Sequence, residues 1–202
     1  MNSPDYIKLK EQLEQIYLVY TKGFEAYSFN KYLIKPSSEQ EENYLRNSKI
    51  FRMIGVSMFK LSVLELHKLV SNKKNDQLNL YDFSKILKRE DMKKYSSDLI
   101  LMEKFEVLDS YQHLTQKLKI LRDKHYAHTD IIRPDPELTY DDLDTLYDLV
   151  FTIIEQIYIV YFECQIKRLS VVFDPDRFEM IKILAREKDR NLAERFKKFS
   201  NR

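Results

Sequence analysis

The chain has 202 residues, of which 44% are hydrophobic and 33% charged, and its formal net charge is +2. This composition is typical of a globular protein with one sizeable core. A charge so close to zero excludes a strong overall attraction to nucleic acid, so any basic surface must be local. The chain has only two glycines, too few for the many tight turns of a sheet protein, which favours long helices.

The single cysteine, Cys164, excludes an internal disulfide and fits a reducing compartment. The first six residues lack a basic region followed by an apolar one, so no signal peptide is predicted. The most apolar stretch, Leu149–Phe162, is interrupted by Glu155 and Gln156 and is too short to span a bilayer. We therefore expect a soluble, cytoplasmic protein with no membrane partner.

The first predicted helix runs from Pro4 to about Leu33. Ser3 supplies a capping hydroxyl, and a proline is tolerated at the first helical position because its missing N–H would be unpaired there anyway. Apolar residues then recur at helical spacing, namely Leu9, Leu13, Ile16, Tyr17 and Tyr20.

A second long helix is predicted from Ser38 to about Val70. Ser38 is followed three residues later by Glu41, which is the spacing of a capping box. Gly55 lies inside this helix and would allow another backbone to approach closely. A polar loop over 71–76 and a short helix over Leu80–Lys88 are predicted next, and the stretch after them is left unassigned.

One buried stripe is predicted just before the segment Arg122–Asp130. The apolar residues recur at steps of three and four, and they are Tyr111, Leu114, Leu118 and Leu121. Pro134 and Pro136 then interrupt the chain.

Thr139 and Asp142 predict the start of a strongly apolar helix. One face of it carries Leu143, Leu146, Val150, Ile153, Ile157 and Tyr161. Asp174-Pro175 opens a last helix that continues to the C-terminus. We therefore expect a helical bundle over residues 1–170 and a C-terminal helix over 171–202, packed on the same domain or on a dimer partner.

The segment that follows the buried stripe carries groups suited to cleaving RNA without a metal. Such cleavage needs a base for the ribose 2′-hydroxyl, an acid for the departing 5′-oxygen and a cation for the phosphate. Imidazoles suit the first two tasks because their pKa lies near neutrality, and His125 and His128 both lie here. Arg122 suits the third because a guanidinium matches phosphate oxygens.

Arg122, the polar Asp123, four further residues and His128 resemble the signature of the HEPN superfamily. The segment Leu121–Asp130 is most similar to the AbiU-like branch, found in phage abortive-infection systems. The resemblance covers roughly Ser38–Leu169 and implies an all-α, up-down antiparallel helical bundle with two long helices. It also implies a homodimer in which two copies of the motif line one RNA-cleaving cleft. Asp123 stands where asparagine is common in the family and could engage the guanidinium.

The resemblance selects His128 as general acid or base, Arg122 as the cation at the phosphate, and Asp123 as the residue that orients one of them. Contacts with RNA are a candidate role for the remaining polar residues of the segment, Lys124, His125, Tyr126 and Thr129. Solvated or capping roles fit Lys124 and Thr129 better, and packing in an interface fits Tyr126 equally well. No cofactor is expected, and a metal site is improbable because no separate cluster of ligands accompanies the histidines. An antitoxin or another regulatory protein is a further expected partner.

Several simpler interpretations stay open. His125 continues the buried stripe and fits a hydrogen-bonded core or interface histidine better than a base, although it competes with His128. His128 could cap the helix C-terminus, and Arg122 could be an ordinary ion-pair partner. His67 and His113 have no partner evident in the sequence and are expected to be structural or exposed. A non-catalytic module that binds RNA, nucleotide or protein is the alternative function.

Overall fold

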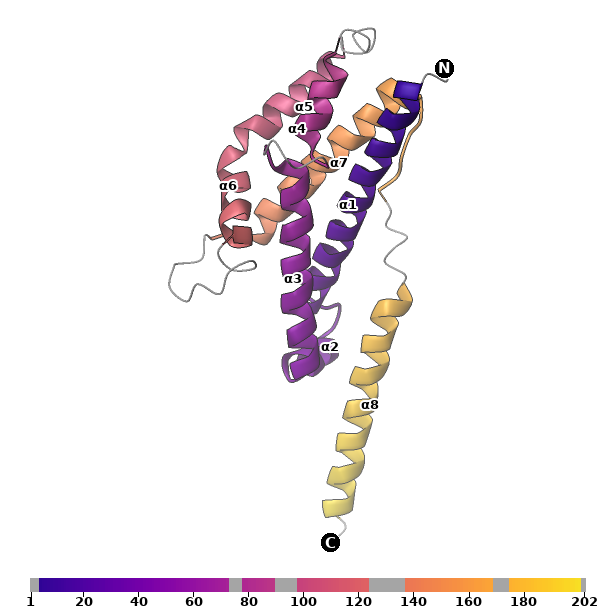
Figure 1. The fold of residues 1–202 in the computed structure, drawn as a ribbon. Coiled ribbons are helices and arrows are strands. Elements are labelled where there is room, and N and C mark those ends of the chain that lie inside the picture. The colour runs from indigo at the N-terminus through magenta and orange to yellow at the C-terminus, as the bar shows by residue number, and fades with distance from the viewer. Residues whose placement is uncertain (1–3, 73–77, 90–97, 124–136, 169–174, 201–202) are drawn as a thin grey trace. The chain divides into compact units, whose positions relative to one another are not determined.

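The computed structural model describes residues 4–72, 78–89, 98–123, 137–168 and 175–200, and these contain eight helices and no strand (Figure 1). The all-α fold expected from the sequence is confirmed. In chain order the helices are α1 (Pro4–Ile34), α2 (Glu39–Arg46), α3 (Lys49–Val70), α4 (Leu80–Leu87), α5 (Leu99–Ser110), α6 (Gln112–Leu121), α7 (Tyr140–Phe162) and α8 (Pro175–Ser200).

The chain divides into two compact units. Unit 1 comprises Met1–Phe24 and Lys60–Arg168, and unit 2 comprises Glu25–Phe59 and Leu169–Arg202. Helices α1 and α3 each contribute residues to both units. The predicted domain division after residue 170 stays a prediction.

Helix α7 supplies much of the core of unit 1 and begins where the sequence predicts. The Thr139 hydroxyl accepts a hydrogen bond from the Asp142 N–H at 3.1 Å, and the Asp142 carboxylate accepts one from the Thr139 N–H at 3.0 Å. This reciprocal capping box satisfies two N–H groups that the first turn leaves unpaired. The six residues of the predicted apolar face are all buried.

Among the described helices, α7 is long and apolar enough to cross a membrane by length and composition, with 23 residues and a mean hydropathy of 1.3 over an 18-residue window. The helix is thus longer than the apolar stretch seen in the sequence. Half of that window is buried inside the protein, and the core helix of a soluble protein passes the same test. The absence of a membrane partner stays a prediction.

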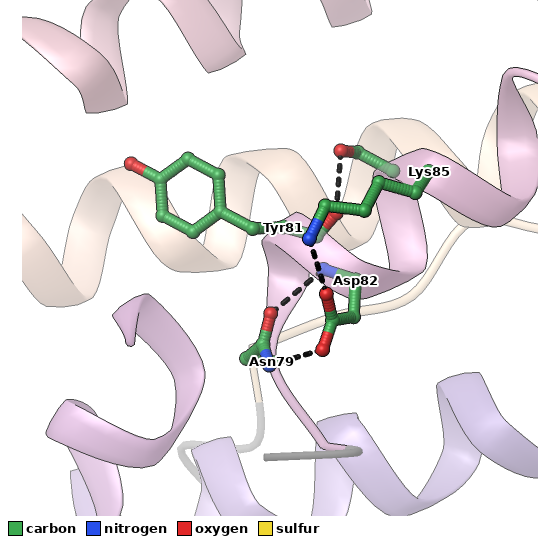
Figure 2. Close-up of polar contacts among 5 residues, drawn as sticks. Asn79, Tyr81, Asp82 and Lys85 are labelled. Atoms are coloured by element: carbon green, nitrogen blue, oxygen red, sulfur yellow. Dashed lines mark hydrogen bonds and ion pairs between the residues drawn. The ribbon is translucent and has the colours of Figure 1, made fainter. Parts of the chain in front are cut away.

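Helix α4 confirms the predicted short helix, ending one residue earlier, and Figure 2 shows its capped start. The Asn79 amide oxygen accepts a hydrogen bond from the Asp82 N–H at 2.7 Å, and Lys85 pairs with the Asp82 carboxylate at 2.6 Å. Helix α5 was not predicted. Its N-cap is Asp98, whose carboxylate accepts from the Leu101 N–H at 3.0 Å, and the helix packs against α6 and α7.

The predicted single helix from Ser38 to Val70 is wrong at Asn47 and Ser48, where α2 ends and α3 begins. The Asn47 side chain donates to the Asn43 carbonyl at 2.8 Å, and the Ser48 hydroxyl accepts from the Phe51 N–H at 3.4 Å. Short polar side chains compete in this way for backbone groups, which favours a break between two helices over one continuous helix.

Unit 2 has a small core of its own. Leu45, Phe51 and Ile181 are buried together, and α2 packs against α8. Beside this core the Tyr32 hydroxyl donates to the Glu41 carboxylate at 2.6 Å. Burial by itself raises the pKa of the Glu41 carboxyl. The hydrogen bonds from Tyr32 and from the backbone together lower it by more, so the pKa of Glu41 lies below its ordinary value.

The close approach predicted at Gly55 is found at Gly23 instead. A Cβ added at Gly55 would meet only side-chain atoms of unit 2, at 3.6 Å, which is ordinary contact. A Cβ added at Gly23 would lie 2.8 Å from the Tyr147 hydroxyl and 2.9 Å from the Glu65 Cβ. Glycine at position 23 is therefore what lets α1, α3 and α7 approach one another within unit 1.

Candidate active site

Helix α6 places Arg122 at its C-terminal end. Leu114, Leu118 and Leu121 are buried, so this face of the helix is fixed in the core of unit 1. Arg122 follows directly with φ −59° and ψ −52°, and its N–H still bonds to the carbonyls of the last turn. Because its backbone stays helical, the direction of the Arg122 side chain is set by the buried leucines.

The Arg122 guanidinium lies between the side chains of Asp123 and His67. Its Nε donates to the Asp123 Oδ1 at 2.7 Å, and its Nη2 donates to the same oxygen. On the other side, its Nη1 lies 3.1 Å from the His67 Nδ1. The Arg122 side chain is 20% exposed and that of Asp123 is 42% exposed. The guanidinium is thus oriented by two partners while part of it still reaches solvent.

The contact with Arg122 fixes the protonation of His67. An arginine side chain only donates hydrogen bonds and does not lose its proton in proteins. The His67 Nδ1, at 3.1 Å from Nη1, must therefore accept, which leaves the imidazole neutral with its proton on Nε2. Because His67 is only 3% exposed, this neutral imidazole is held firmly beside the guanidinium.

His67 is the site residue that sequence reasoning missed. It lies four residues after Val63 and three before Val70, both buried, so the spacing already places it on the apolar face of α3. A buried imidazole needs a hydrogen-bond partner. That partner is Arg122, which lies 55 positions further along the chain, and no local pattern reveals a pair so distant.

A polar cavity of about 340 Å³ adjoins this arrangement and shares His67 with it. It is lined by residues at the end of α3, on α4 and on α6, all within unit 1. The lining residues are His67, Val70, Ser71, Asn72, Tyr81, Gln112, Thr115, Gln116 and Lys119.

Helix α6 and the first turn of α7 are tied together by an ion pair. The Lys117 Nζ lies 3.5 Å from the Asp142 Oδ2. Burial by itself raises the pKa of the Asp142 carboxyl. Its hydrogen bonds with Thr139 and the charge of Lys117 together lower it by more, so the pKa of Asp142 lies below its ordinary value. This ion pair therefore fixes the end of α6 that carries Arg122 relative to the capped start of α7.

The structure brings together two of the predicted site residues, since Arg122 and Asp123 are in direct contact as expected. The other five, Lys124, His125, Tyr126, His128 and Thr129, lie outside the described residues. Their predicted roles, and the choice between the two histidines, stay predictions. Where the chain is described, no group of three or more His, Cys, Asp or Glu side chains is arranged to hold a metal ion.

Comparison with known protein families gives a match over most of the chain. The HEPN family model described as AbiU2 matches residues 6–186, which is most of the chain and includes Arg122 to His128. No curated protein and no solved structure matches.

Proposed function

The chain belongs to the HEPN AbiU2 family, and from this premise we propose that it is a metal-independent endoribonuclease of the phage-defence or toxin type. The active site would form where the Arg122–His128 segments of two copies meet in a homodimer. The observation that carries the proposal is the Arg122 guanidinium, which is oriented by His67 and Asp123 beside a polar cavity.

In the proposed reaction the ribose 2′-oxygen attacks the neighbouring phosphorus, and the bond from phosphorus to the 5′-oxygen breaks. A histidine takes the 2′-hydroxyl proton, and a protonated histidine gives a proton to the leaving 5′-oxygen. The products are a 2′,3′-cyclic phosphate and a free 5′-hydroxyl. His128 is assigned to this proton transfer, and two copies of it are available in the homodimer.

Arg122 would stabilise the negative charge that builds on the phosphate oxygens. A guanidinium has five N–H donors, and the contacts with Asp123 and His67 engage three of them. The remaining donors are held in a fixed direction before substrate arrives, which is the condition for effective electrostatic catalysis. Asp123 would act as the residue that orients Arg122.

The same proposal gives roles to the other polar residues of the Arg122–Asp130 segment and names the expected partners. Lys124, His125, Tyr126 and Thr129 would contact RNA around the cleaved bond. A regulatory protein or antitoxin would restrain the activity, and the protein would act in the cytoplasm on RNA.

RNA cleavage in the presence of EDTA tests the proposal. We expect the wild type to cleave RNA under these conditions and to leave 2′,3′-cyclic phosphate ends. His128→Ala and Arg122→Ala should each lower the rate by about a hundredfold or more, whereas the exposed His113→Ala should not change it. If His125→Ala removes activity and His128→Ala does not, the assignment of the histidine is wrong.

A non-catalytic RNA-binding module is the second candidate, favoured by the Asp123 carboxylate, which already occupies part of the guanidinium. If the protein is such a module, the wild type binds RNA in a filter-binding assay and Arg122→Ala binds it more weakly. Neither protein cleaves RNA in the presence of EDTA. Wild-type cleavage that depends on His128 would exclude it.

A further inference from the structure

One face of α6 carries a polar row that leads to Arg122. Gln112, Thr115, Lys119 and Arg122 follow one another at steps of three, four and three, which places them on the same side of a helix. The buried leucines of α6 occupy another face. Three members of this row line the polar cavity, and the fourth is the guanidinium assigned to the scissile phosphate.

The opposite wall of the cavity comes from the end of α3 and from α4. His67, Ser71 and Asn72 line it from α3 and the residues just after it, and Tyr81 lines it from α4. The Tyr81 hydroxyl donates to the Asp109 carboxylate at 2.9 Å, which holds the ring in one orientation. In Figure 2 the Tyr81 ring projects away from the polar cluster of Asn79, Asp82 and Lys85.

The charge of the lining distinguishes this cavity from a second cavity of unit 1. This second cavity has nearly the same volume, about 350 Å³, but its lining includes three carboxylates, Asp98, Glu106 and Asp109, against one cation, Lys88. The cavity beside His67 has no carboxylate in its lining and one cation, Lys119. Lys119 makes no ion pair with any residue that the structure describes. A phosphate is therefore favoured in the cavity beside His67 and disfavoured in the other.

We propose that the cavity beside His67 binds one unstacked nucleotide of the RNA strand, next to the nucleotide that is cleaved. The inference rests on the proposed ribonuclease function and adds a specificity subsite to it. The volume lies at the small end of the range for ligand pockets, roughly 300–1,000 Å³, which suits a single nucleotide. Lys119 contacts the phosphate, and Tyr81 offers an aromatic face for stacking.

The amide side chains supply the base-reading groups. Gln112, Gln116 and Asn72 each present both a donor and an acceptor, which is what hydrogen bonding to the edge of an unpaired base requires. Lys119 precedes Arg122 by three residues, or about 4.5 Å along a helix axis. A nucleotide bound at Lys119 is therefore adjacent to a phosphate bound at Arg122, so the cavity selects which base neighbours the cleaved bond.

Binding of the four nucleoside 3′-monophosphates to the full chain, measured by calorimetry, tests the subsite directly. We expect one of the four to bind most tightly. Lys119→Ala should weaken all four about tenfold, and Gln116→Leu should weaken the preferred one about tenfold and reduce the discrimination. The matched controls, Lys104→Ala and Gln165→Leu, change residues outside the cavity of unit 1 and should leave binding unchanged.

Mapping of cleavage sites on a mixed-sequence RNA separates this inference from the proposed function. Loss of base preference in Gln116→Leu, with cleavage retained, supports both. If no RNA is cleaved but the nucleotides bind and Lys119→Ala weakens them, the subsite stands and the ribonuclease proposal fails. If wild type cleaves RNA while the nucleotides do not bind at millimolar concentration, or bind equally to Lys119→Ala and Gln116→Leu, the subsite is overturned. Unchanged thermal midpoints confirm that the variants fold.

Discussion

Arg168 and Arg122 both belong to unit 1, yet their guanidinium groups lie in opposite surroundings. The Arg168 Cζ lies 4.8 Å from the ring centroids of both Phe24 and Phe151, and its Nη1 pairs with Asp148 at 2.6 Å. Among the described residues, the partners of the Arg122 guanidinium are the polar side chains of Asp123 and His67, and His67 also lines a polar cavity. An arginine stacked against rings stabilises the fold, whereas one that keeps open donors can receive an anion.

The surroundings of Arg168 form an aromatic cluster with little room for change. Tyr20 is 1% exposed and its ring packs against those of Phe24, Tyr147 and Phe151, with centroids 5.7 to 6.0 Å apart. The Tyr147 hydroxyl donates to the Ser62 carbonyl at 2.9 Å. Changes in this cluster should therefore lower stability, and changes around Arg122 should lower activity.

Tyr147→Ala gives the largest expected effect. Removing a fully buried ring leaves a cavity among the other aromatic rings, and we expect the free energy of unfolding to fall by about 4 kcal/mol. Tyr147→Phe keeps the ring but removes the hydroxyl and its hydrogen bond to Ser62, and should cost about 1 kcal/mol. Chemical denaturation followed by circular dichroism measures both. Equal losses for the two variants would show that the ring itself contributes little.

Gly23→Ala tests how closely the helices of the cluster approach. The added Cβ would lie 2.8 Å from the Tyr147 hydroxyl and 2.9 Å from the Glu65 Cβ, so these side chains must shift. We expect a loss of about 2 kcal/mol in the free energy of unfolding. Gly55→Ala is the matched control, because its Cβ would have ordinary contacts and the change removes a flexible residue from a helix. An equal loss at both positions would contradict the packing explanation.

His67→Leu tests whether His67 positions the Arg122 guanidinium for catalysis. Without its acceptor the guanidinium is held on one side only, so we expect kcat for RNA cleavage to fall about tenfold while KM changes little. His67→Asn places an amide oxygen near the position of Nδ1 and should restore part of the rate. A change in KM alone, or no rescue by asparagine, would contradict a positioning role.

Arg168→Ala should have a smaller effect, and that effect should be on stability and not on the rate of RNA cleavage. The Asp148 carboxylate is mostly exposed, so the ion pair contributes little, and the ring contacts account for most of the expected loss of about 1 kcal/mol. The thermal midpoint should fall, and the rate of RNA cleavage per folded molecule should not. A fall in kcat without a change in the midpoint would overturn the distinction between the two arginines.

Alkaline pH should weaken the fold gradually. Burial raises the pKa of Tyr158 and of Tyr161 to about 12, from an ordinary value of 10. Between pH 10 and 12 the unfolded chain loses these protons while the folded chain keeps them, so stability is complete below pH 10 and falls as the pH rises. At pH 10.5 the loss should be below about 1 kcal/mol for each tyrosine. Thermal midpoints at pH 9 to 11 measure it, and a midpoint independent of pH would contradict it.

Periodicity and capping residues were sufficient to predict much of the fold. Thr139 and Asp142 predicted the start of α7, and the steps between Leu114, Leu118 and Leu121 predicted the buried face of α6. The α5 helix was missed, although Asp98 caps its start. Several of its apolar residues, such as Leu99, are exposed, so its sequence lacks a one-sided apolar pattern.

The candidate site was predictable only where its parts are neighbours in the chain. Arg122 and Asp123 are adjacent, so their contact could be expected from the sequence. His67 and Lys119 reach the same cavity from different helices, and only the packing of α3 against the rest of unit 1 brings them together. Pairings of that kind depend on the tertiary fold, which no local spacing encodes.

The ion pair between Lys117 and Asp142 has a consequence for how this protein can diversify. It joins the two helices on either side of segment 124–136, so that segment can gain or lose residues without displacing Arg122 or the start of α7. Lengthening the connection between two elements that are already joined costs little free energy, because the entropy of closure grows only with the logarithm of its length. Changes in the length or sequence of that connection should therefore leave the position of Arg122 on α6 and the capped start of α7 unaltered.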